Sequence, residues 1–523
     1  MTSARPRWTA PSRGDVLAGT SVALVLVPQS LAYAQLAGAP PVHGLYTAIA
    51  APLAAALFAS SPYLQTGPVA LTGLLTLAAL QTQVPVGTES FAASAALLAL
   101  VVGVARILLG VLRAGVIGYL LSAPAVAGFT TGAALLIVAS QIPTLLGEPS
   151  TSSNPAVAAA RALAHPDRWD LGALALALGV VALVRACRRL NPLVPGVLLA
   201  TVGALTLVAV LGPIGAPVGR LDVRPPDFPP VLPWGQLPSL LLPGLVIAVV
   251  GFAEPAAIAR RYATAERQRW SPDRELVAQG VANVAAGLAS GLPSGGSFSR
   301  TALNRLAGAT SRWSGALTGL AVLALLPLTA VLSTLPRAAL AGLVIAPTVS
   351  LIDVHVLRRY WRLSPAQALV AGVTLLATLV LAPHLERAVL VGVGLALVVH
   401  LWRELHLPVQ VELDGRTLRL RPYGVLYFAS APGLEDRLLA LLLEHPQVDH
   451  VVIDLGGMGR IDLTGMLALR ALIDDFSARV DVEVVNVSPT AARLVDRVLL
   501  TTARRHDRGR PTGQPREPRS TGR

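Results

Sequence analysis

The chain has 523 residues, of which 53% are hydrophobic and only 14% are charged, and its mean hydropathy is +0.62. A soluble domain carries roughly 25% charged residues, so this composition excludes a chain built of soluble domains alone. The formal net charge of +13 could suggest a nucleic-acid partner. However, the arginines occur in short clusters between apolar runs, at 185–189, 260–269 and 358–362. That distribution follows the positive-inside rule for membrane proteins and argues against nucleic-acid binding.

Apolar segments near the length that crosses ~30 Å of hydrocarbon recur along the first four fifths of the chain. The fourteen predicted spans are 14–36, 43–60, 66–82, 91–111, 124–146, 169–185, 193–212, 238–259, 275–291, 297–309, 314–334, 338–352, 365–382 and 386–402. With the N-terminus in the cytoplasm, the arginine clusters after spans four, six, eight, ten, twelve and fourteen fall on the cytoplasmic side. We therefore expect a short cytoplasmic segment at 1–13 and an all-α polytopic membrane domain at 14–403. Both termini would be cytoplasmic, and the domain would lie in the inner (plasma) membrane of the cell.

The pattern of polar breaks suggests an internal repeat. A long span near 28–35 and another near 245–259 carry proline and polar residues, and about forty residues after each a short span opens at a glycine-rich break, 65–68 and 295–300. Seven spans form each half, and an odd number gives the two halves opposite orientations. This inverted repeat is typical of secondary transporters, whose broken helices meet near the midplane.

After Trp402 the sequence changes character. It reads as a hairpin at 408–420, a helix at 433–445, a strand at 448–455, a helix at 463–478, a strand at 482–487 and a helix at 489–499. Alternating strands and helices predict a small cytoplasmic α/β domain at 408–502. The remaining residues, 503–523, form a basic tail that has almost nothing to bury and that we expect to be disordered.

The two breaks, Thr66-Gly67-Pro68 and Gly295-Gly296-Ser297, carry the main functional prediction. Irregular backbone inside a membrane is tolerated only where it is buried in protein or lines a cavity. Each break frees N–H groups at the start of a short helix, and a helix N-terminus carries about half a positive charge. Two such termini facing one pocket make an anion site, to which Ser297 and Ser299 could add hydroxyl donors. The alternative is that both breaks are loops between spans.

Four polar residues near these breaks are candidates for the same site. Arg300 lies just inside an apolar segment, where a charge is costly and usually functional; the alternative is an arginine that snorkels to the interface. Glu254 lies within an apolar span, where a carboxyl group taken from water retains its proton more readily, as a proton-coupling group must; alternatively it is a structural partner of Arg300. Gln29 and Tyr33 share one helix face, from which they could bind substrate or bond to a neighbouring helix.

The chain contains no Walker loop, HExxH, GxSxG or Cys/His cluster, and its single cysteine is Cys187. These motifs hold nucleotides, metals and nucleophiles in enzymes and ATP-driven pumps. We therefore expect neither an enzyme nor a cofactor or metal site.

With these residues in hand, the chain resembles the SulP family of sulfate permeases and related anion transporters. The resemblance rests on VPQSLAYAQLAGAPPVHGLY at 27–46, TGPVA at 66–70, GFTTGAALLI at 128–137 and ELVAQGVANVAAGLASGLPSGGSFSRTALNRLAGATSRWSG at 275–315. The C-terminal domain resembles STAS domains through VVIDLGGMGRIDLTGMLAL at 451–469. The resemblance covers nearly the whole chain, from about Arg13 to Leu500.

The resemblance implies a core and a gate domain built from two inverted seven-span repeats, in which the core moves like an elevator, often within a homodimer. It implies an anion between the short helices that begin at Thr66 and Ser297. Its lining would be Gln29, Tyr33, Val69, Ala70, Ser297, Phe298, Ser299 and Arg300, together with the backbone at Thr66, Gly67 and Gly296, and Glu254 matches an acidic position nearby. Ile258 and Phe298 replace the hydroxyl residues that help bind sodium in some members, which disfavours sodium coupling. Thr464 matches a phosphorylated position of stand-alone STAS proteins, although a helix-capping role is the alternative.

These observations predict secondary active transport of sulfate, bicarbonate or a C4-dicarboxylate by alternating access, with proton symport through Glu254 and regulation by the STAS domain. The expected partners are the anion, protons, the lipid bilayer, a second copy of the chain and a cytoplasmic partner of the STAS domain. Three alternatives stay open: an uncoupled anion channel or exchanger, a nucleobase permease of the same architecture, and a membrane tether for a functional STAS module.

Overall fold

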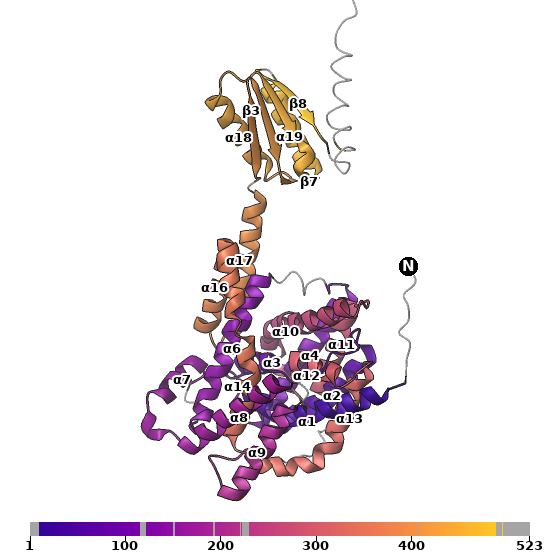
Figure 1. Ribbon diagram of the computed structural model, residues 1–523, viewed down its shortest axis with the longest axis vertical. Coiled ribbons are helices and arrows are strands. Elements are labelled where there is room, and N and C mark those ends of the chain that lie inside the picture. The colour runs from indigo at the N-terminus through magenta and orange to yellow at the C-terminus, as the bar shows by residue number, and fades with distance from the viewer. Residues whose placement is uncertain are drawn as a thin grey trace, which may run out of the picture. The chain divides into compact units, whose positions relative to one another are not determined.

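The computed structural model describes residues 10–115, 122–149, 152–191, 194–219, 221, 230–405, 407–477, 479–487 and 494. The chain divides into two compact units, Met1–Ala396 and Leu397–Arg523, whose elements are labelled in Figure 1. Each unit is described by itself below.

Every predicted span corresponds to a helix within a few residues. The first seven are α1 (Arg13–Leu36), α2 (Val42–Phe58), α3 (Ala70–Leu80), α4 (Glu89–Val111), α6 (Ala123–Leu145), α8 (Leu171–Leu190) and α9 (Gly196–Leu211). The second seven are α10 (Leu237–Ala265), α11 (Pro272–Leu288), α12 (Phe298–Leu306), α13 (Trp313–Leu325), α14 (Arg337–Thr348), α16 (Pro365–Val380) and α17 (Leu385–Leu405). Helices that the sequence did not predict are α7 (Pro155–Leu163) and α15 (Val354–Leu363), with the 3₁₀ turns η1 (Pro166–Arg168) and η2 (Trp234–Gln236). The 3₁₀ segments η3 (Leu326–Thr334) and η4 (Val349–Leu351) complete the predicted spans 314–334 and 338–352.

Helix length separates true spans from broken ones. Within the described residues, seven helical segments are long and apolar enough to cross a membrane, and five shorter helices are also apolar. At 1.5 Å per residue, the 11 residues of α3 and the 9 residues of α12 reach only about halfway across. These two helices therefore begin inside the membrane domain, as the glycine-rich breaks predict.

The helices pack in two groups. One group contains α1 to α4 and α10 to α13, and its most extensive contact joins α4 to α11. Glycine makes that contact close: a Cβ on Gly103 would lie 2.8 Å from the Gly280 carbonyl oxygen, and a Cβ on Gly280 would lie 2.8 Å from that of Gly103. The other group contains α6, α8, α9, α14 and α16, where a Cβ on Gly342 of α14 would lie 2.8 Å from the carbonyl oxygen of Ala177 in α8. Small residues allow such approaches in membrane bundles, where packing rather than hydrophobic burial joins the helices.

Two very short strands tie the halves of the first group together. β1 (Thr66–Gly67) pairs antiparallel with β2 (Gly295–Gly296), with Thr66 opposite Gly296 and Gly67 opposite Gly295. The strands satisfy each other's backbone groups in a region where no water is available to do so. They lie directly before α3 and α12, so that both short helices start from one place.

The C-terminal unit is an α/β domain. Its strands are β3 (Val409–Asp414), β4 (Thr417–Pro422), β5 (Gly424–Leu426), β6 (His450–Asp454), β7 (Met458–Ile461) and β8 (Asp481–Val485), with η5 at Leu455–Gly457 and helices α18 (Ala431–Glu444) and α19 (Leu463–Phe476). The main sheet has the strand order β3-β4-β6-β8. Strands β3 and β4 form the predicted antiparallel hairpin, which turns at Gly415 with φ +59°. The other two strand pairs of this sheet are parallel. Alternate residues of β4 and β6 pack against α18 and α19 in one core.

One strand pair in this unit was not predicted from the sequence, the parallel strands β5 and β7. The predicted helix at 489–499 and the predicted disordered tail at 503–523 fall almost wholly outside the described residues. The fold class is nevertheless the expected one: a mostly helical membrane domain followed by an α/β domain.

Candidate anion-binding site

The strand pair that precedes α3 and α12 is held by buried side chains of α11. The Gln279 amide donates to the Thr66 hydroxyl at 2.7 Å. Asn283 accepts from the Ser294 N–H at 2.8 Å and donates to the Ser294 carbonyl at 3.2 Å. Since the polar groups of α11 are used in this way, the starting points of both short helices are fixed relative to one another.

The first turns of both helices present N–H groups without helical partners. In α3 the first helical bond runs from the Gly73 N–H to the Val69 carbonyl at 3.0 Å. In α12 Ser297 is the N-cap: its carbonyl accepts from the Thr301 N–H at 3.0 Å and its hydroxyl accepts from the Arg300 N–H. Glu254 of α10 lines one cavity together with Ser297, Phe298 and Ser299, so the acidic residue of α10 reaches the start of α12.

Arg300 occupies the space between these termini. Its side chain is 1% exposed, and among the residues that the structure describes none of its three guanidinium nitrogens has a hydrogen-bond partner. The guanidinium lies against Gly67, where an added Cβ would be 3.5 Å from Nη2. It does not reach a surface, as a snorkelling arginine would, and among the described residues it forms no ion pair with Glu254. A buried cation without a partner is costly, and a bound anion would relieve that cost.

Gln29 and Tyr33 face the same region from α1. Both are buried, and the Gln29 carbonyl oxygen has no hydrogen-bond partner within the described part of the chain. An unsatisfied amide next to an unsatisfied guanidinium is an arrangement that a polar ligand could complete.

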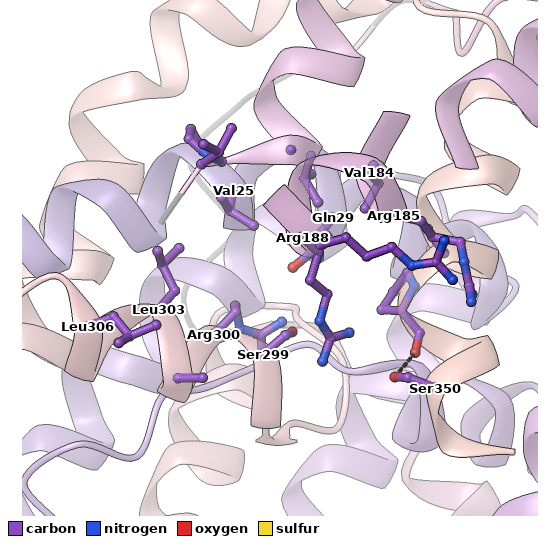
Figure 2. Close-up of a pocket in the computed structure, with 18 residues that line it drawn as sticks. Val25, Gln29, Val184, Arg185, Arg188, Ser299, Arg300, Leu303, Leu306 and Ser350 are labelled. Atoms are coloured by element: carbon purple, nitrogen blue, oxygen red, sulfur yellow. Dashed lines mark hydrogen bonds between the residues drawn. The ribbon is translucent and has the colours of Figure 1, made fainter. Parts of the chain in front are cut away.

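Two cavities meet at this point. The smaller, about 60 Å³, is lined by residues of α1, α3, α10 and α12, among them Tyr33, Val69, Ala70, Glu254, Ser297, Phe298 and Ser299. The larger, about 450 Å³, is lined by Gln29, Ser299 and Arg300 on one side and by Arg185, Arg188 and Arg189 on the other. Figure 2 shows Arg185 and Arg188 of α8 and Ser299 and Arg300 of α12 around this larger cavity. Ser299 and Arg188 line both cavities, so the two spaces adjoin.

Most of the predicted lining is therefore brought together by the fold. Three predicted residues, Thr66, Gly67 and Gly296, lie in the strand pair and not among the residues that line either cavity. Their contribution is to set the position of the helix starts.

Sequence reasoning missed two arginines. The cluster at 185–189 was taken only as a marker of topology, whereas Arg188 of α8 lines both cavities. Arg106 of α4, inside a predicted span, is fully buried. A single arginine inside an apolar segment is itself a signal that could have identified it.

In the C-terminal unit, the capping role considered for Thr464 belongs to another residue. Asp462 is the N-cap of α19, where its carboxylate accepts from the Gly465 N–H at 2.7 Å. Thr464 is exposed and donates its hydroxyl to the same carboxylate at 2.8 Å.

Nearby, the Asp454 carboxylate is buried at the end of β6. Burial alone would raise its pKa, but hydrogen bonds from the Gly456 N–H at 2.9 Å and from Asn486 at 3.0 Å, with the charges of Arg421 and Arg419, hold the pKa below its usual value. The ionised carboxylate therefore contributes to the stability of this unit.

Two short helices that start side by side within a bundle of apolar helices, with a buried arginine between their first turns, define a membrane transporter for small anions. The sequence agrees with that class: the sulfate permease family model matches residues 13–374, and the STAS domain model matches residues 408–502. The chain belongs to the sulfate permease family, whose members are transporters and not enzymes.

Known proteins resemble the chain over most of its length. A probable sulfate transporter of Mycobacterium tuberculosis is 34% identical over 493 residues, covering 89% of this chain and 87% of that protein. The chloroplastic sulfate transporter 4.1 of Arabidopsis thaliana is 31% identical, covering 92% of this chain and 76% of that protein.

Solved structures share the fold. The murine solute carrier 26 family member A9 anion transporter in its inward-facing state gives a TM-score of 0.81 at 21% identity, covering 95% of this chain and 88% of that chain. The transmembrane domain of a cyanobacterial bicarbonate transporter gives 0.63 at 25% identity, covering 73% of this chain and 97% of that chain.

Proposed function

We propose that the chain carries sulfate, or a closely similar small oxyanion, across the membrane by alternating access. The observation that carries this proposal is the buried Arg300 guanidinium at the point where α3 and α12 begin, whose three nitrogens lack partners among the described residues. The names of the relatives favour sulfate, and that of one structural neighbour keeps bicarbonate as a second candidate. A C4-dicarboxylate is the third.

Glu254 is proposed to couple transport to protons. Its carboxylate lines the smaller cavity and lies at the start of α12, near the Arg300 charge but not paired with it. When Glu254 is ionised, its charge opposes an incoming anion; when it is protonated, the full charge of Arg300 is available. Anion and proton then bind together, which is the requirement for symport. No hydroxyl side chain stands at Ile258 or Phe298 to support a sodium site in its place.

The arrangement of the two helix groups suggests the conformational step. The group of α1 to α4 and α10 to α13 carries the site, while Arg185, Arg188 and Arg189 belong to α8 in the other group. The larger cavity runs from the site to this arginine cluster, which the positive-inside rule assigns to the cytoplasm. We infer an inward-open arrangement, in which movement of one group against the other would transfer the site to the opposite side. Dimer formation, an inner-membrane location with cytoplasmic termini, and regulation through the STAS domain and Thr464 complete the proposal.

The test is uptake of radiolabelled sulfate, bicarbonate and fumarate into proteoliposomes, with and without an inward proton gradient, by wild type, Glu254→Gln and Arg300→Ala. We expect the proton gradient to drive sulfate uptake by wild type. Uptake should be lost in Arg300→Ala, and in Glu254→Gln it should continue without responding to the gradient. Uptake that is independent of the gradient in wild type and unchanged in Glu254→Gln would reduce that residue to a structural role. If no anion moved under any condition, the transport proposal would be refuted.

The alternatives are tested in the same vesicles. Flux that does not saturate with sulfate concentration would favour a channel. Uracil uptake would favour a nucleobase permease. Transport that survives removal of residues 408–523 would count against a membrane tether whose function resides in the STAS domain.

A further inference from the structure

A second arginine lies buried behind the site. The Arg106 side chain of α4 is 0% exposed. Its Nε donates to the Ala248 carbonyl at 3.1 Å, its Nη2 to the Ile247 carbonyl at 3.2 Å, and its Nη1 to the Ser294 carbonyl at 3.0 Å. Ser294 directly precedes β2, so the guanidinium bridges α10 to the strand pair.

The position of Arg106 relative to the site follows from Gly251. An added Cβ on Gly251 would lie 2.7 Å from Arg106 Nη2 and 3.5 Å from Thr72, which is in the first turn of α3. Glu254 follows Gly251 by one helical turn on α10. Arg106 therefore lies one layer of residues behind the lining of the smaller cavity and does not touch the cavity itself.

The charge of Arg106 has no counterpart. All three of its hydrogen bonds end on neutral carbonyls, and among the described residues no carboxylate forms an ion pair with it. A neutral donor such as a glutamine amide could satisfy some of these carbonyls at a much lower cost of burial, because an ionised group is far more expensive to take out of water than a polar one. The full charge at this position therefore calls for an explanation beyond packing.

We propose that Arg106 is a fixed second positive charge that makes the site selective for divalent over monovalent anions. This inference rests on the proposed function, and it specifies the substrate class of that site. The positive charge of Arg300 and the negative charge of an ionised Glu254 cancel. When Glu254 is protonated, Arg300 and Arg106 together supply two positive charges, which balance a dianion such as sulfate and over-compensate a monoanion. The Coulomb energy between Arg106 and a dianion is twice that between Arg106 and a monoanion. Removing the Arg106 charge therefore raises the dissociation constant of the dianion by the square of the factor by which it raises that of the monoanion.

For charges on the order of 10 Å apart at an effective dielectric constant of ~20, that factor is roughly tenfold for a monoanion and roughly a hundredfold for a dianion. The probes are sulfate and perchlorate, two tetrahedral anions that carry two charges and one. Binding of each is measured on the purified full-length chain by titrating the thermal denaturation temperature, for wild type, Arg106→Gln and Arg106→Lys. We expect the preference for sulfate over perchlorate to fall roughly tenfold in Arg106→Gln and to be retained in Arg106→Lys, which preserves the charge but not the three-carbonyl geometry.

A purely structural brace gives a different result. In that case both anions weaken by the same factor, and Arg106→Lys behaves like Arg106→Gln; either finding overturns the proposal. Should Arg106→Gln fail to fold, Gly251→Ala replaces it, because the new Cβ pushes the guanidinium away from the site without removing it, and the same preference should fall by a smaller factor. An unchanged preference in Gly251→Ala would then count against the proposal. If wild type binds neither anion, the proposed function itself fails.

Discussion

Arg300 gives a prediction that separates binding from stability. Replacing it with methionine, an apolar side chain of similar length, removes a buried cation whose guanidinium has no hydrogen-bond partner among the described residues. Replacing a buried ion pair by packed apolar side chains is often neutral or stabilises a protein by about 1–4 kcal/mol, and a buried polar group without a hydrogen bond costs about 1–3 kcal/mol. We therefore expect Arg300→Met to increase the free energy of unfolding of the anion-free protein by about 1–3 kcal/mol. For a chain of this size, that corresponds to a denaturation temperature about 2–5 °C higher.

The assay is thermal denaturation of the purified protein in detergent, in sulfate-free buffer and across a sulfate titration. At a sulfate concentration of about 100 times Kd, ligand binding should stabilise wild type by about 2.7 kcal/mol, whereas Arg300→Met should not respond. The matched control is Arg305→Met on the same helix, because Arg305 pairs with Glu266 at 2.6 Å. That variant should lose stability and retain the sulfate response. A loss of stability in sulfate-free Arg300→Met, or a normal response to sulfate, would refute the view that Arg300 is kept for the anion.

Two further predictions concern the strand pair and the STAS unit. Gly296→Ala places a Cβ 2.8 Å from Leu64 and 3.2 Å from Pro255, so we expect about 1–3 kcal/mol of destabilisation and weaker sulfate binding. The control Gly372→Ala, whose Cβ would have nothing within 4 Å among the described residues, should change neither stability nor binding. Equal behaviour of the two variants would contradict the importance of the close approach at Gly296. Asp454→Asn should destabilise the isolated domain at 408–502 by about 1–3 kcal/mol at neutral pH. Because the pKa of Asp454 is lowered in the folded state, the greater stability of wild type is present above about pH 4 and disappears as the pH falls through the folded pKa. Urea unfolding of both proteins across this pH range tests the prediction. A difference in stability that does not vary with pH would be inconsistent with this account.

The sequence was informative wherever apolar length and charge determine the outcome. Span boundaries followed from the cost of exposing backbone and charge to lipid, and the glycine-rich breaks located the starts of α3 and α12. The hairpin β3–β4 was predictable because alternation and a turn at Gly415 are local signals.

Features that depend on distant residues were not predictable in this way. The pairing of β1 with β2 joins segments more than two hundred residues apart, and strands of two residues leave no periodicity to detect. The inward direction of Arg188 depends on how α8 packs against its neighbours, because an arginine near a helix end looks the same in sequence whether it faces solvent or a cavity. Arg106 was the one visible signal that was overlooked.

The link between β1 and β2 uses main-chain atoms only. Thr72 and Thr301 add side-chain bonds across it, to the Pro293 carbonyl at 2.9 Å and from the Gln65 N–H at 3.1 Å. Other side chains in the first turns of α3 and α12 can change without weakening the connection between the two turns. Natural selection could exchange Val69, Ala70 or Ser299 to fit a different anion while the paired helix starts and the buried arginine are retained. In a scaffold of this kind the transport mechanism is kept while the transported anion changes.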